Sequence, residues 1–128
     1  MSRRAIAVLT ADNHLDLTAY PSRVGLTGDA FFSFTQIIEY CQQQELPLVV
    51  AGDLLNHSLP PARVAEFLRW QLTEMANRDL PVYLIQGNHD TARPPWFCAV
   101  SDHATPIHAR SFALGDFRFA GASAGLAV

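Results

Sequence analysis

The chain has three short apolar runs, each followed directly by polar residues of the kinds that bind metal ions. The runs cover residues 5–9, 48–51 and 82–85. A short continuous apolar run is typical of a strand that is buried on both faces of a parallel or mixed sheet. Three such runs, separated by longer stretches, constrain the fold more than any other feature of this sequence.

Helical patterns fill the stretches between the runs. In the first stretch, Phe34, Ile37, Ile38 and Cys41 share one face of a helix that we expect to end near Gln44. In the second stretch, a proline pair is typical of a helix start. The inward face of this second helix, which should end near Asn77, comprises Val64, Phe67, Leu68, Leu72 and Met75. The order β-α-β-α-β predicts an α/β fold.

The pattern changes after residue 91. The proline pair before Trp96 predicts a short helical segment. Gly115 and Asp116 predict a tight hairpin turn. The short strands that we expect in this part of the chain are residues 107–110, 111–114 and 117–120.

Length and hydrophobic content indicate a single domain. The chain has 128 residues, of which 49% are hydrophobic, and this is enough to build a core. Residues 121–128 are small and apolar and contain no charge. We therefore expect residues 1–128 to be the N-terminal part of one domain, truncated at its C-terminal end.

The composition argues against several classes of protein. The formal net charge is -3 and there is no basic tract, so a strong electrostatic footprint for nucleic acid is absent from the sequence. No run approaches the ~20 apolar residues of a membrane span, and we expect no membrane association. Cys41 and Cys98 are isolated and suggest neither a disulfide framework nor a zinc knuckle, so a cytoplasmic location is the simplest interpretation.

The polar residues after the three apolar runs should meet in space. Right-handed crossovers would make the three strands parallel neighbours, with their C-terminal ends at one edge of the sheet. Asp12 and His14 follow the first run, Asp53 follows the second, and Asn88 and His89 follow the third. Carboxylate, amide and imidazole groups together suit a pair of divalent cations. The sequence therefore predicts a two-metal phosphoesterase site.

Each of these residue types suits a particular role. Asp53 is the candidate for the anionic ligand that bridges the two metals. Asp12 and His14 are separated by one residue, so in an extended segment both side chains would point toward the first metal. Asn88 would give the second metal a neutral oxygen ligand, which preserves the electrophilic character of the site.

His89 and Asp90 are the candidate catalytic pair. An extended segment would turn His89 away from Asn88, as suits a general acid or a phosphate contact. Asp90 would then hold the second ring nitrogen of His89. As a hypothesis, hydroxide activated by the metal pair attacks phosphorus in line, and His89 stabilises or protonates the leaving oxygen.

The series Asp12-x-His14, Gly52-Asp53 and Gly87 to Asp90 resembles the calcineurin-like metallophosphoesterase superfamily. Segments 9–15, 50–55 and 59–61 are similar to its DNA repair exonuclease branch. The resemblance covers roughly residues 5 to 91. It implies an α/β/β/α sandwich, of which this chain would form an incomplete part, and two divalent ions, usually Mn²⁺, with Fe, Zn or Mg²⁺ as alternatives.

The resemblance also implies roles for single residues. Asp12, His14 and Asp53 would hold one metal, Asp53 and Asn88 the other, and His89 would be the catalytic histidine. Asn56 and His57 stand close to the position where part of this branch has a further histidine, so they are candidate contacts to substrate phosphate. A downstream ligand histidine, a Gly-His-x-His motif and the capping domain of the branch are not found in the sequence.

The leading functional interpretation is a metal-dependent DNA nuclease or exonuclease of the repair type. By resemblance its partners would be DNA, an ATPase subunit and a second copy of the chain. Alternatives are a phosphodiesterase or phosphatase that acts on small molecules or proteins, and a non-catalytic fragment. Because the ligand shells would be partial, we expect the isolated chain to bind metal weakly and to hydrolyse little.

Overall fold

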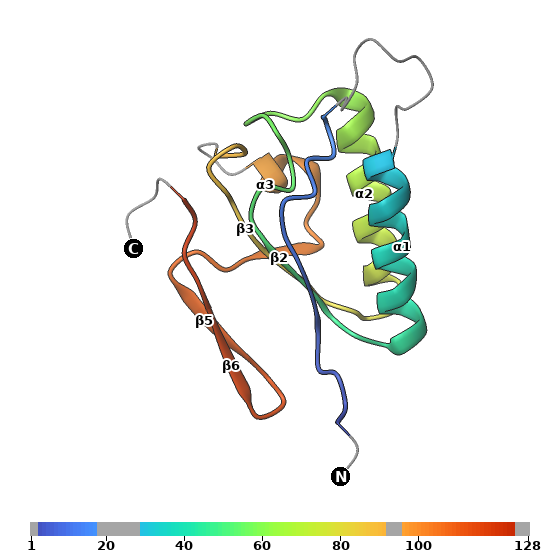
Figure 1. The fold of residues 1–128 in the computed structure, drawn as a ribbon, viewed down its shortest axis with the longest axis vertical. Coiled ribbons are helices and arrows are strands. Elements are labelled where there is room, and N and C mark those ends of the chain that lie inside the picture. The colour runs from blue at the N-terminus through green and yellow to red at the C-terminus, as the bar shows by residue number, and fades with distance from the viewer. Residues whose placement is uncertain (1–2, 18–28, 92–95, 125–128) are drawn as a thin grey trace.

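The computed structural model describes residues 3–17, 29–91 and 96–124, without the side chains of residues 98 and 99. The helices and strands alternate in the first two thirds of the chain, and a hairpin follows (Figure 1). In chain order the elements are β1 (Val8–Thr10), α1 (Asp29–Gln44), β2 (Leu48–Ala51), α2 (Ala62–Ala76), β3 (Val82–Ile85), α3 (Trp96–Val100), β4 (Ala104–Pro106), β5 (Arg110–Leu114) and β6 (Phe117–Gly121).

A four-stranded parallel sheet forms the centre of the fold. Its strand order is β1-β2-β3-β4, and every neighbouring pair is parallel. Strands β2 and β3 pair along their whole length, from Leu48 beside Val82 to Ala51 beside Ile85. The C-terminal ends of β1, β2 and β3 therefore lie at one edge of the sheet, and the predicted α/β fold is confirmed.

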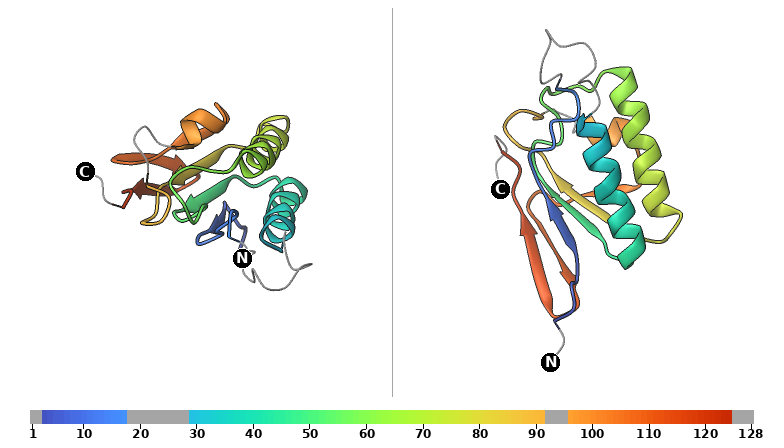
Figure 2. Two further views of the ribbon diagram at one scale, coloured as in Figure 1. Left: turned by 90° about the horizontal axis from the view of Figure 1, so that it is seen from above. Right: turned by 45° about the vertical axis from the view of Figure 1, so that its right-hand side comes forward.

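Helices α1 and α2 cover one face of this sheet (Figure 2). Phe34, Ile38 and Cys41 of α1 are buried in one core cluster with Leu68 and Leu72 of α2. Each fully buried side chain of the size of leucine contributes roughly 1.5–3 kcal/mol to folding. Burial raises the pKa of the Cys41 thiol to about 11, so this thiol serves as an apolar core group.

The β5–β6 hairpin forms a second sheet on the other side of the parallel sheet (Figure 2). The ring of Phe112 stacks on Tyr83 of β3 at 3.9 Å between centroids, and Phe119 stacks on Phe112 at 5.2 Å. The sheet is thus packed between helices and hairpin, so the residues described form three layers, α/β/β. This arrangement fits an incomplete α/β/β/α sandwich.

Both predicted helices, the strands β2 and β3 and the hairpin turn are confirmed. Gly115 at the turn has φ of 56°, a backbone conformation that glycine adopts more readily than other residues. The short helix expected near Trp96 is α3, and the prolines before it lie outside the described residues. Strand β1 is shorter than expected, since it begins at Val8.

The expected strand at residues 107–110 is wrong. The strand in this region is β4, three residues earlier, which pairs with β3 at the edge of the sheet. Ile107 still donates its amide to the Leu84 carbonyl at 3.1 Å, but Ala109 has φ of 53° and turns the chain toward the hairpin.

Among the residues that the structure describes, no helix has the length and apolar character that a membrane span requires.

Candidate metal centre

The segment after β1 lies alongside the segment after β2. The amide of Asp12 donates to the Gly52 carbonyl at 3.1 Å, and the amide of His14 donates to the Asp53 carbonyl at 3.1 Å. Leu15 continues this pairing one residue further along the chain. The backbone itself therefore brings the first two groups of predicted ligands together, beyond the ends of their strands.

This pairing depends on a left-handed backbone at three of the predicted ligands. The φ angles are 54° at Asp12, 44° at His14 and 50° at Asp53. The expectation of an extended segment at Asp12 to His14 is therefore wrong. A left-handed residue other than glycine costs roughly 1–2 kcal/mol, and such strain is concentrated at functional sites. In this conformation Nε2 of His14 lies 3.9 Å from a carboxylate oxygen of Asp53.

Two glycines allow the segments after β2 and β3 to meet. Gly52 has φ of 87°, and a Cβ there would lie 3.0 Å from the Gly87 Cα. A Cβ on Gly87 would lie 1.9 Å from Oδ1 of Asp53, which is far inside van der Waals contact. The glycine before Asn88 is therefore required so that the third loop can reach the Asp53 carboxylate.

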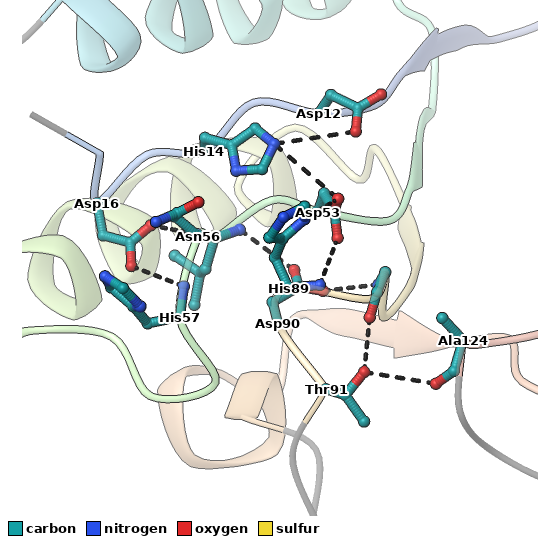
Figure 3. Close-up of polar contacts among 12 residues, drawn as sticks. Asp12, His14, Asp16, Asp53, Asn56, His57, His89, Asp90, Thr91 and Ala124 are labelled. Atoms are coloured by element: carbon teal, nitrogen blue, oxygen red, sulfur yellow. Dashed lines mark hydrogen bonds and ion pairs between the residues drawn. The ribbon is translucent and has the colours of Figure 1, made fainter. Parts of the chain in front are cut away.

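One carboxylate oxygen of Asp53 lies near a ring nitrogen of both His89 and His14 (Figure 3). The His89 amide donates to Oδ1 at 3.0 Å, and the ring Nδ1 of His89 lies 2.6 Å from Oδ2. Burial alone would raise the pKa of Asp53, but the amide and ring of His89, together with His14, lower it overall. Asp53 is therefore an ionised carboxylate that is shared by both imidazoles.

The contact with Asp53 also shifts the pKa of His89. The hydrogen bond to Asp53 raises the pKa of the imidazole above 6.5, partial desolvation opposes the shift, and the charges of Asp53, Asp12 and Asp90 reinforce it. A carboxylate only accepts hydrogen bonds, so Nδ1 of His89 carries a proton. The ring of His89 belongs to the cluster with His14 and Asp53; its predicted orientation away from Asn88 stays a prediction.

His14, Asp53 and His89 form the group that could hold a metal ion. One ligand atom from each lies within 4.8 Å of the others. Nε2 of His14 is 3.9 Å from a carboxylate oxygen of Asp12 and 3.9 Å from one of Asp53, too far for hydrogen bonds. Two carboxylates and two imidazoles at these separations suit a divalent first-row cation. A metal ion therefore fits this group, while the predicted assignment of two ions to Asp12, His14, Asp53 and Asn88 stays a prediction.

The sequence predicts that Asp90 holds the ring of His89, but in the structure it does not. Its side chain is fully buried, Oδ1 accepts the Gly87 amide at 2.6 Å and Oδ2 accepts the Leu55 amide at 3.2 Å. The ring nitrogen Nδ1 of His89 contacts Asp53 instead. Asp90 therefore joins the loops after β2 and β3 through their backbones.

Three other predicted residues lie around the cluster. Asn88 is exposed on the loop between Gly87 and His89, and its role as a ligand stays a prediction. Asn56 and His57 belong to the loop after β2, and Figure 3 shows the His57 side chain beside Asp16 rather than beside the cluster. Their contact with phosphate also stays a prediction.

Sequence reasoning missed Asp16. Its carboxylate accepts the amides of Asn56 and His57, the latter at 3.1 Å. The signal was present in the sequence, because Asp16 continues the alternation of Asp12 and His14 by one more step.

Residues after the hairpin complete the third loop. The hydroxyl of Ser123 accepts the Gln86 amide at 3.1 Å, and the amide of Ala124 donates to the Gln86 carbonyl at 3.0 Å. Thr91 donates its hydroxyl to the Gly87 carbonyl at 2.6 Å. The loop that carries His89 is therefore fixed on two sides, by Asp90 and by residues 123–124.

Comparison with known proteins agrees with this geometry. Over 81 residues the chain is 31% identical to the DNA double-strand break repair protein Mre11 of Methanococcus maripaludis, a match that covers 62% of this chain. The chain spans only 22% of the length of that relative. Residues 7–121, which include all three ligand-bearing loops, match the family described as calcineurin-like phosphoesterase. The chain therefore belongs to the calcineurin-like phosphoesterase family.

Proposed function

We propose that this chain carries metal ligands of a phosphodiester hydrolase that acts on DNA. The observation that supports this proposal is the cluster of His14, Asp53 and His89, whose ligand atoms lie within 4.8 Å of one another. Three separate strands deliver these residues to one edge of the sheet. A structural ion pair would need only two of them.

The proposed ligands of the metal pair are Asp12, His14, Asp53 and Asn88. Divalent cations bound there would supply Lewis acidity and acidify a water molecule. Mn²⁺ is the proposed metal because oxygen donors outnumber nitrogen donors in this set, and oxygen-rich sites suit manganese.

His89 is the proposed general acid. Its Nδ1 proton is engaged by Asp53, so the ring is oriented and Nε2 is available to a substrate. The hydrogen bond to Asp53 raises the pKa of His89, which favours the proton-donating form of the ring. Nε2 would transfer its proton to the leaving oxygen as the bond from phosphorus to that oxygen breaks, while Asp53 stabilises the ring.

DNA is the proposed substrate because the chain is similar to a DNA double-strand break repair protein. An ATPase subunit and a second copy of the chain are the proposed partners, and the cytoplasm is the proposed location. The net charge of -3 favours a second candidate, a phosphodiesterase or phosphatase that acts on a small molecule.

A substrate panel on the complete gene product separates these functions. Linear double-stranded DNA, single-stranded DNA, bis(p-nitrophenyl) phosphate and p-nitrophenyl phosphate are incubated with Mn²⁺ or with a chelator. We expect Mn²⁺-dependent cleavage of DNA and of the diester. Cleavage of the monoester alone would identify a phosphatase. Absence of bound metal and of all cleavage would contradict the proposal and favour a non-catalytic fold.

A further inference from the structure

The loop after β2 is attached to its neighbours through carboxylates. The backbone pairing with the segment after β1 ends where Leu15 donates to the Leu54 carbonyl at 2.9 Å. The next three amides of the loop, at Leu55, Asn56 and His57, donate to side chains. Leu55 donates to Asp90, while Asn56 and His57 donate to the two oxygens of Asp16.

Asp16 thus extends the attachment beyond the backbone pairing. Each of its oxygens accepts one amide, in an orientation that Figure 3 shows clearly. Hydrogen bonds from amides to an ionised carboxylate are stronger than those between neutral groups. The side chains of His57, Ser58 and Leu59 are exposed, so packing does little to fix this part of the loop.

We propose that Asp16 is a positioning residue, which fixes the backbone of Asn56 and His57 in the loop that follows the proposed ligand Asp53, so that a substrate at the metal centre meets this loop in one conformation. The Asp16 segment follows His14 by two residues, and the loop follows Asp53 by three. Asp16 therefore connects the segment that follows His14 to the loop that follows Asp53. The part of this inference that concerns substrate rests on the proposed function.

Three variants test the inference. Asp16→Ala removes both acceptor oxygens. Asp16→Asn keeps the shape of the side chain but leaves one acceptor oxygen, because its NH₂ group cannot accept an amide. Asp102→Ala is the matched control, since Asp102 is an exposed aspartate in the turn between α3 and β4.

The first measurement is amide hydrogen exchange by NMR on the 128-residue chain. We expect exchange at Asn56 and His57 to accelerate about tenfold or more in Asp16→Ala, and at one or both of these amides in Asp16→Asn. Asp102→Ala should leave both rates unchanged. Wild-type exchange rates at both amides in Asp16→Ala would overturn the inference, because the carboxylate would then not hold the loop. Wild-type rates at both amides in Asp16→Asn would also overturn it, because the shape of the side chain would then be sufficient.

The second measurement is kinetic and uses the complete gene product with Mn²⁺ and a phosphodiester. We expect kcat/KM of Asp16→Ala to fall about 10- to 100-fold, mainly through a higher KM, with bound manganese unchanged. Faster exchange with unchanged kcat/KM would overturn the positioning role. A wild-type protein without hydrolysis would contradict the proposed function instead, and the exchange data would still decide whether Asp16 holds the loop.

Discussion

Asp53 accepts two hydrogen bonds from His89, one from the amide at 3.0 Å and one from ring Nδ1 at 2.6 Å. The proposed bridging ligand therefore also orients the proposed general acid. In the proposed mechanism, metal binding and proton transfer would share a single carboxylate, so substitutions at the two residues should have different signatures.

His89→Ala in the complete gene product should lower kcat about 100- to 10,000-fold, because the leaving oxygen loses its proton donor. Bound manganese, measured by elemental analysis, should remain, since Asp12, His14 and Asp53 are intact. Asp53→Ala is the comparison and should lose both metal and turnover. If His89→Ala also loses its metal, His89 is a ligand rather than the general acid.

Asp53→Asn should lower the pKa of His89 in the metal-free chain, because the hydrogen bond and the charge that raise it are removed. An NMR titration of the imidazole resonances measures this shift. The resonances of His103, which is exposed in the turn before β4, should be unchanged by the substitution. A His89 pKa that stays the same in Asp53→Asn would contradict the assigned contact.

The same contact predicts how stability depends on pH. His89 has a raised pKa, so its contribution is complete below 6.5 and is lost as pH rises through the raised value. Asp53 has a lowered pKa, so its contribution is present above 3.8 and is lost as pH falls through the lowered value. The free energies of unfolding of wild type and His89→Ala, measured with urea, should therefore differ most between pH 3.8 and pH 6.5. A constant difference across the whole range would exclude the ion pair as its source.

Gly87→Ala should displace the Asp53 carboxylate, since the new Cβ would lie 1.9 Å from Oδ1. We expect the free energy of unfolding to fall by about 1–3 kcal/mol and metal binding to be lost. Gly115→Ala is the matched control, because its Cβ meets nothing within 4 Å and only the φ of 56° is unfavourable. It should cost about 1 kcal/mol and leave metal binding intact. Calorimetric titration with Mn²⁺ distinguishes the two variants.

Asp90→Ala should destabilise the chain by about 2–4 kcal/mol, because the amides of Leu55 and Gly87 lose a charged acceptor. The midpoint and slope of a urea transition give this value. Asp90→Asn should lie between the alanine variant and wild type. A stable Asp90→Ala protein with low turnover would instead restore Asp90 to the catalytic role that its sequence position suggested.

Much of the fold could be predicted because its elements are specified locally. The stripe at Phe34, Ile38 and Cys41 gives a helix from its spacing alone, and the apolar runs of β2 and β3 give buried strands. Strand β4 has no such signal. Ala104–Pro106 is short and contains proline, which only an edge strand tolerates, and its pairing with β3 is decided by tertiary contacts.

The site divides in the same way. The rule that parallel strands end at one edge was sufficient to bring His14, Asp53 and His89 together. The left-handed backbone at Asp12 and His14 could not be predicted, because it accompanies pairing with the loop after β2, which is distant in the sequence. The contacts of Asp16 and Asp90 could not be predicted either, because their partners are backbone amides, which nearly every residue has and which leave no pattern in the sequence.

The hydrogen bond between Ser123 and Gln86 joins residues 37 positions apart. The loop that bears His89 thus acquires its final restraints only after the hairpin has been synthesised and has folded back. The segment that leads from β3 to His89 is therefore held both by Asp90, which follows it directly, and by residues that come after the hairpin.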